Sequence, residues 1–222
     1  MMTALLLANA FLLGLAHALE PDHVAAVSTF ISRYPGRRRA VRFCVRWGIG
    51  HMIPLLACLV GAGLVGTALP AGSASYAERG VGLMLIGLGA WLVRDVWSGR
   101  VHLHAHEHGG VRHVHLHAHV HTPAHDHGHA RTVVAVGIMH GLAGSASVLV
   151  LAAVSMGSSV WLGAAYVLTF SCGVIVAMAL YGVSTGAVLE RFARARPGWL
   201  RLTQLAAGGF SVLLGAVWVL AV

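Results

Sequence analysis

The stretch HALEPDH, residues 17–23, places two histidines and two acids within seven residues near the start of the chain. Imidazole nitrogens combined with carboxylate oxygens suit divalent ions such as Ni²⁺, Co²⁺ and Zn²⁺, whereas Mg²⁺ and Ca²⁺ prefer oxygen donors and Cu⁺ prefers sulfur. The stretch interrupts an apolar segment, where ionisable groups are costly and usually functional. We therefore take His17, Asp22 and His23 as candidate metal ligands. For Glu20, the roles of proton carrier and of polar partner for the backbone rank above that of ligand.

A proline lies between these candidate ligands. On a regular helix, His17 and Asp22 would point about 140° apart, too far to share one ion. Pro21 lacks an N–H, and its ring collides with the carbonyl four residues earlier, which belongs to His17. We predict that the helix bends between His17 and Asp22, frees the carbonyl of His17, and lets the two side chains converge.

Two further histidines lie inside apolar segments. His51 occurs in WGIGHMIP and His140 in GIMHGLAG, each beside glycines that allow close helix packing. Either histidine alone is equally well explained as a hydrogen-bonding residue between helices, and the sequence leaves that alternative open. Taken together with the HALEPDH stretch, they complete a candidate set of four imidazoles and one carboxylate.

The elements that must position these residues are apolar helices. Of the 222 residues, 57% are hydrophobic and 10% are charged, which excludes a soluble domain and indicates an all-α integral membrane protein. A helix needs about 20 apolar residues to cross a bilayer. We predict six spans, at residues 2–31, 43–69, 77–96, 132–156, 160–189 and 200–222. The first is expected to be a retained helix rather than a signal peptide, because no basic residue precedes it and the apolar sequence resumes after GLAHA.

The distribution of arginine predicts the orientation. The chain has no lysine, and every arginine except Arg79 lies at or beyond the ends of spans one, three and five. By the positive-inside rule those three loops are cytoplasmic and both termini lie outside a bacterial or archaeal cytoplasmic membrane. Trp47, Trp97 and Trp199 would then lie at the cytoplasmic membrane interface. The high pI is thus explained by topology and gives no reason to expect nucleic-acid binding.

A short internal repeat links the two halves of the chain. Aligning GLAHALEPD with GIMHGLAGS matches Gly14 with Gly137 and His17 with His140. Each copy begins a half of three spans, and an odd number of spans inverts the second half, which places a substrate site near the midplane. We therefore divide the chain into a first three-helix repeat (1–97), a His-rich cytoplasmic loop (98–131) and a second three-helix repeat (132–222).

The loop contains two alternating histidine runs around Gly109-Gly110. The sequence leaves two alternatives open, a flexible metal-binding tract or a two-residue β-hairpin. A hairpin would pair Ala105 with Val114, Leu103 with Leu116 and Glu107 with Arg112 on one face. On the other face it would pair the accessory metal candidates, His106 with His113, His104 with His115 and His102 with His117.

HALEPDH resembles the His-x4-Asp-His signature of the nickel/cobalt transporter family, and GIGHMIP resembles the second signature of that family. MHGLAGSASVL and YVLTFSCGVIVAM are similar to the third and fourth signature helices of the shorter members related to urease accessory transporters. The resemblance extends over all six expected spans and implies metal selection by His17, Asp22 and His23, joined by His51 and His140. The chain departs from the long members in having six spans rather than eight and no acid in GLAGSA, which leaves the choice between nickel and cobalt open.

These features predict a secondary transporter rather than an enzyme. Without lysine there is no complete phosphate-binding loop, and no zinc-protease or desaturase histidine motif lies in a span. An interior-negative potential of 100 mV gives about 4.6 kcal/mol for inward movement of a divalent ion. We therefore expect uptake of Ni²⁺ or Co²⁺, with efflux as the main alternative.

The sequence also leaves several other functions open. A zinc transporter is less favoured, because the zinc/iron permeases have eight spans and the cation-diffusion type has a soluble C-terminal domain. A metal-storing membrane anchor is a further alternative. No cofactor apart from the metal is expected, and the sequence leaves the oligomeric state and a cytoplasmic metallochaperone partner open.

Overall fold

The computed structural model describes residues 1–33, 36–65, 73–99, 101–108, 111–118, 127–143, 159–195 and 197–221. Within these ranges the chain forms seven helices and one two-stranded hairpin. Their order is α1 (Met2–His17), α2 (Pro21–Arg33), α3 (Arg37–Val65), α4 (Ser73–Trp97), β1 (Val101–His108), β2 (Val111–Ala118), α5 (His127–Ala143), α7 (Val160–Ala195) and α8 (Pro197–Ala221).

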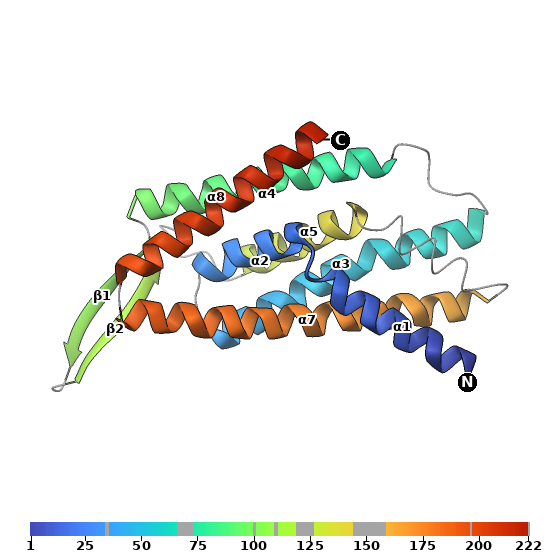
Figure 1. Cartoon of the computed structure of the whole chain (residues 1–222), viewed down its shortest axis with the longest axis horizontal. Coiled ribbons are helices and arrows are strands. Elements are labelled where there is room, and N and C mark those ends of the chain that lie inside the picture. Colours follow the sequence, from blue (N-terminus) through green and yellow to red (C-terminus); the bar gives the residue numbers. More distant parts are fainter. Residues whose placement is uncertain are drawn as a thin grey trace.

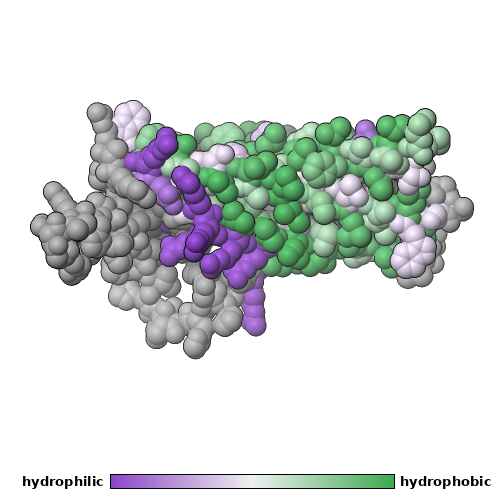
Figure 2. All heavy atoms as spheres, turned by 90° about the horizontal axis from the view of Figure 1, so that it is seen from below, coloured by the Kyte–Doolittle hydropathy of each residue, from purple (hydrophilic) through white to green (hydrophobic). Residues whose placement is uncertain are grey.

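The helices form an elongated bundle, with the hairpin extending from one end, the N-terminus at the opposite end and the C-terminus partway along the bundle (Figure 1). Figure 2 shows apolar residues over most of one face, with hydrophilic residues gathered toward the left-hand end. Large apolar side chains such as Leu83, Leu180 and Leu213 are exposed on the outside of the bundle. This exposure is the pattern of a protein surrounded by lipid, because acyl chains cover an apolar surface without cost.

Four described helices are long and apolar enough to cross a membrane: Arg37–Gly61, Ser75–Trp97, Val160–Phe192 and Gly198–Ala221. The bent pair Met2–His17 and Pro21–Arg33 gives a fifth span if the two are counted as one. The chain is therefore a multi-pass membrane protein. The remaining predicted span, 132–156, is represented by the short apolar helix Arg131–Ala143, and its second half lies outside the described residues. The count of six and the inverted repeat stay predictions.

Two helices extend beyond their predicted ends. α3 begins at Arg37, so that Arg38, Arg39 and Arg42 lie on its first turns rather than in a loop, and α7 continues past residue 189 to Ala195. Arginine is a good helix former, and its long side chain reaches the membrane surface from a helical backbone. The predicted loop boundaries were wrong at these two places for that reason.

The predicted bend near Pro21 is confirmed. α1 ends at His17, α2 begins at Pro21, and their axes differ by 60°. Proline is well suited to the first position of a helix, where its missing N–H is not needed. The expectation of a free His17 carbonyl was wrong, because this oxygen accepts a hydrogen bond from the Glu20 N–H at 3.0 Å. The last turn of α1 tightens instead of opening, which satisfies the carbonyls at the helix end.

Glycines allow the closest helix contacts. α1 packs on α7, α5 on α3, α3 on α7, and α4 on α8. A Cβ atom at Gly14 would overlap the backbone carbonyl of Phe170, and one at Gly137 would overlap that of Trp47. Close backbone approach at small residues is the usual basis of helix packing in membranes. These contacts bring α1 and α5, the helices that carry His17 and His140, against α7 and α3.

The far end of α2 is held by polar contacts. Arg33 forms an ion pair with Asp95 of α4, and its guanidinium carbon lies 3.6 Å from the centroid of the Trp91 ring. The Gln204 side chain of α8 donates a hydrogen bond of 2.8 Å to the Ser32 carbonyl. α2 is thereby fixed to both α4 and α8 at the end opposite to Asp22 and His23.

The hairpin has the register predicted from the alternating histidines. β1 and β2 pair antiparallel, with Glu107 opposite Arg112 nearest the turn among the predicted pairs. The three histidine pairs occupy alternate positions of this ladder: His102 with His117, His104 with His115, and His106 with His113.

Candidate metal site

Four histidines from four helices meet inside the bundle. The ring centroid of His23 lies 4.6 Å from that of His17, 5.5 Å from that of His51 and 5.0 Å from that of His140. His23, His51 and His140 are each 1% exposed, whereas the His17 side chain is 11% exposed. The structure therefore brings together all four histidines that the sequence singles out in the helices. We call this group the four-histidine cluster.

Glu20 orients the ring of His17. The two atoms His17 Nδ1 and Glu20 Oε1 are 2.8 Å apart, so the ring N–H donates to the carboxylate. This arrangement leaves the lone pair on Nε2, which lies 3.4 Å from Nε2 of His51. Two imidazole nitrogens bound to one tetrahedral ion at about 2.1 Å are about 3.4 Å apart. The two Nε2 atoms of His17 and His51 therefore have the separation that a shared metal ion requires. The same separation fits a hydrogen bond if one of the two nitrogens carries a proton.

His140 is oriented by its own helix. Its Nδ1 donates a hydrogen bond of 2.9 Å to the Val136 carbonyl, which leaves the lone pair on Nε2. Within the described ranges, Nε2 of His140 and Nδ1 of His51 have no hydrogen-bond partner. A buried polar atom without a partner costs free energy, and each such case calls for an explanation. A ligand held between the rings would explain why these atoms have no partner within the described part of the protein.

Asp22 and His23 are neighbouring buried residues of the site. Asp22 is 3% exposed, and its Oδ1 lies 3.2 Å from His23 Nδ1. This contact lacks the geometry of a hydrogen bond, so that Asp22 Oδ1 and both ring nitrogens of His23 find no such partner in the part of the chain that the structure describes. At the first turn of α2, the Asp22 carboxylate also lies at the positive end of the helix dipole.

The potential ligand atoms fall into two overlapping sets. One atom from each of His17, His23 and His51 lies within 4.8 Å of the others, and the same is true of Glu20, Asp22 and His23. His17 and Asp22 were predicted to converge on one ion, but among the described residues they belong to different sets that share His23. His23 is thus the residue that links the two sets, since it lies next to both His17 and Asp22.

Two aromatic residues of the site were not found from the sequence. Trp47 was expected at the membrane interface, but it is fully buried, with its ring 5.1 Å from His23, 5.4 Å from His51 and 5.6 Å from His140. Phe170 lies 5.3 Å from the His17 ring. A signal was present for Trp47, which precedes His51 by four residues and so shares its helix face.

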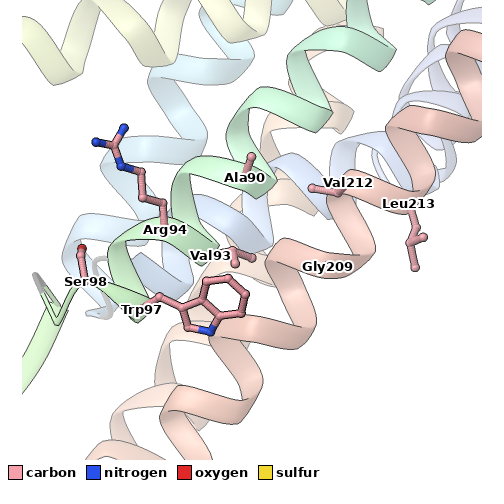
Figure 3. Close-up of a pocket in the computed structure, with 8 residues that line it drawn as sticks. All are labelled: Ala90, Val93, Arg94, Trp97, Ser98, Gly209, Val212 and Leu213. Atoms are coloured by element: carbon pink, nitrogen blue, oxygen red, sulfur yellow. The ribbon is translucent and has the colours of Figure 1, made fainter.

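The predicted accessory histidines lie elsewhere. His102, His104, His106, His113, His115 and His117 are on β1 and β2, which extend from the end of the bundle (Figure 1). An open groove of about 780 Å³ between α4 and α8 is also separate from the cluster. Figure 3 shows that its lining is mainly apolar and that Arg94 points away from α8. None of the candidate ligands lines this groove.

The sequence of this chain is similar to that of a known protein. The urease accessory protein UreH of Bacillus sp. (strain TB-90) is 32% identical to this chain over 168 residues, which are 76% of this chain and 70% of UreH. The chain belongs to the UreH family. UreH is in turn a member of the nickel/cobalt transporter family that the HALEPDH motif resembles. No protein-family model and no solved structure matches the chain. As a UreH-family protein with several apolar helices, the chain is of transporter type and is not an enzyme.

Proposed function

We propose that this UreH-family protein moves Ni²⁺, or Co²⁺, inward across the cytoplasmic membrane of a bacterium or archaeon by secondary transport. The observation that supports this proposal is the four-histidine cluster, where His17 and His51 present Nε2 atoms 3.4 Å apart beside the buried carboxylate of Asp22. Such a mixture of imidazole and carboxylate donors suits borderline divalent ions. The name of the relative attaches UreH to urease, and we propose that enzyme as one destination of the metal.

Side-chain exposure suggests a route into the cluster. The Glu20 side chain is 50% exposed, that of His17 is 11% exposed, and His23, His51 and His140 are buried. An ion would first meet a carboxylate and then the ring that this carboxylate orients. Irregular backbone at the α1–α2 break is tolerated in a membrane where it lines a protein or water-filled space. We therefore place the entrance at Glu20.

The direction follows from the charge of the ion. Inward movement of a divalent cation gains about 4.6 kcal/mol per 100 mV of interior-negative potential, equivalent to more than about a thousandfold accumulation. Export would need a separate energy source. The hairpin and the arginine-rich helix ends are placed in the cytoplasm, with both termini outside, because positive charge is retained on the cytoplasmic side.

We also infer two inverted halves. α1 packs on α7 in the way that α5 packs on α3, and the aligned residues Gly14 and Gly137 each contact a backbone carbonyl of the helix concerned. This exchange of partners is what an inverted repeat would produce, with the substrate site between the halves.

The test is uptake of radioactive Ni²⁺ into right-side-out proteoliposomes with an interior-negative potential. We expect His17→Ala and Asp22→Asn to abolish potential-driven uptake, and deletion of residues 101–118 to leave it measurable. His104→Ala in the hairpin is the matched control for loss of one imidazole. Competition by Co²⁺ and Zn²⁺ ranks the metals, and an outward metal gradient tests export. If the wild type moves no metal under any gradient while the hairpin still binds it, a metal-storing anchor replaces the transporter.

A further inference from the structure

Two aromatic rings border the four-histidine cluster. Trp47 is fully buried and touches the rings of His23, His51 and His140, while Phe170 is 2% exposed and touches that of His17. The two rings therefore contact different members of the cluster. Together they leave little room for a hydrated ion to pass without movement of a ring, because a buried aromatic side chain fills its space closely.

The positions of the two aromatics correspond between the halves of the chain. Gly14 contacts the backbone carbonyl of Phe170, and its counterpart in the repeat, Gly137, contacts that of Trp47. The histidine one turn after each glycine then lies beside the same aromatic residue. His17 is 5.3 Å from Phe170, and His140 is 5.6 Å from Trp47. Each half thus supplies a helix with a histidine and an opposing helix with an aromatic ring.

The two rings lie toward opposite ends of the bundle. Trp47 follows the start of α3 at Arg37 by ten residues, and Phe170 follows the start of α7 at Val160 by ten residues. α3 starts at the hairpin end and α7 at the end with the N-terminus (Figure 1). A Cβ at Gly48 would meet the side chain of Ile175, so these two residues lie at one level of the bundle, next to Trp47. Phe170 precedes Ile175 by five residues and therefore lies about 7.5 Å closer to the end with the N-terminus. His51 lies between these two levels.

We propose that Trp47 and Phe170 are paired gates, with Trp47 closing the cluster toward the hairpin end and Phe170 closing it toward the end with the N-terminus. This inference rests on the proposed transport function. Rotation of one ring opens one side while the other ring keeps the opposite side closed, which gives alternating access at a fixed site. The Trp47 indole N–H has no hydrogen-bond partner among the described residues, so no such bond opposes rotation of this ring.

Ser171 offers a reporter position between the gates. It is 1% exposed, and its hydroxyl has no hydrogen-bond partner within the described ranges. Because Ser171 precedes Ile175 by four residues, it shares the face of α7 that packs on α3 near Gly48. In a chain whose Cys44, Cys58 and Cys172 are replaced by alanine, Ser171→Cys supplies the only thiol. Serine and cysteine are similar in size, so this substitution disturbs the packing little.

The experiment measures modification of this thiol by a charged, membrane-impermeant thiosulfonate in vesicles of known orientation. With both gates intact, we expect slow reaction from either side. Trp47→Ala should raise the rate about tenfold or more from the hairpin side alone, and Phe170→Ala should do so from the side of the N-terminus alone, as each variant populates a state that is otherwise minor. Trp47→Phe and Phe170→Tyr keep a ring and should keep the thiol protected.

The proposal is overturned if either alanine variant raises labelling equally from both sides, from the wrong side, or from neither side. Each variant must elute as a single species in detergent. If an alanine variant does not, Trp47→Leu and Phe170→Leu retain more of the buried volume and are measured in its place. Labelling requires no metal flux, so a failure of the gates is distinguished from a failure of nickel transport, which the uptake assay reports separately.

Discussion

At the residue scale, two imidazoles of the four-histidine cluster, those of His17 and His140, are each oriented by a partner outside the cluster. Glu20 accepts from His17 Nδ1, and the Val136 carbonyl accepts from His140 Nδ1. Both hydrogen bonds leave the lone pair on Nε2. Outer partners of this kind set the tautomer and raise the basicity of a ligating histidine. The affinity for metal should therefore depend on residues that need not touch the ion.

Glu20 gives the clearest test of this dependence. We expect Glu20→Ala to weaken Ni²⁺ binding by about 10–100-fold, the usual effect of losing an outer partner. Glu20→Gln should lose less of the affinity for Ni²⁺, because the amide oxygen of the glutamine still accepts a hydrogen bond from the ring N–H of His17. Binding is measured by calorimetry on purified protein, with Glu78→Ala on α4 as the control for loss of a carboxylate. An unchanged affinity for Ni²⁺ in Glu20→Ala would show that Glu20 does not orient the His17 ring for metal binding.

At the scale of elements, helix contacts at glycine determine which rings meet. α5 carries His140 and approaches α3 at Gly137, where a Cβ would overlap the carbonyl of Trp47. α3 in turn carries both Trp47 and His51. A change of a few tenths of an ångström at this interface therefore moves the ring of His140 relative to that of His23. Close helix approach is a requirement of the site as well as of the fold.

Gly137→Ala tests this point. The added methyl group must separate α5 from α3, and we expect destabilisation of about 1–3 kcal/mol, typical of overpacking, together with weaker Ni²⁺ binding. Gly87→Ala on α4 is the matched control, because a Cβ there meets nothing within 4 Å. Thermal unfolding in detergent and calorimetry are the measurements. Equal behaviour of the two variants would contradict the close contact at Gly137.

At the scale of the whole molecule, α2 links the cluster to the opposite end of the bundle. Its first turn carries Asp22 and His23, and its last residue, Arg33, pairs with Asp95 of α4. α2 also packs against α7 and α8. A disturbance at the ion pair should therefore reach the metal ligands through a helix of 13 residues.

Removing one partner of this ion pair should lower the stability of the protein more than removing both. We expect Arg33→Met or Asp95→Asn to lower stability by about 3–5 kcal/mol, because each removes one charge of a buried ion pair. The double variant should recover a large part of this loss. Thermal unfolding of all three proteins gives the coupling between the two residues, and Ni²⁺ affinity reports whether α2 has moved. Strictly additive losses would argue against a coupled pair.

Local patterns in the chain were enough to determine several features of this protein. The bend at Pro21, the apolar helices, the candidate histidines and the hairpin register all follow from rules that act over a few residues. The limits of α3 and α7 were less accurate, because arginines are compatible with both a loop and a helix end. The six spans and the inverted repeat remain predictions, since part of the second half lies outside the described residues.

Contacts between distant residues were decided only by the tertiary structure. His23 belongs to both sets of potential ligand atoms, and Arg33 reaches Asp95 on another helix. Trp47 is buried among three imidazoles instead of lying at the interface. Residue spacing predicts which side chains share a face of one helix, but not which faces of different helices meet. That choice depends on where glycines let backbones approach and on which buried polar groups must find partners.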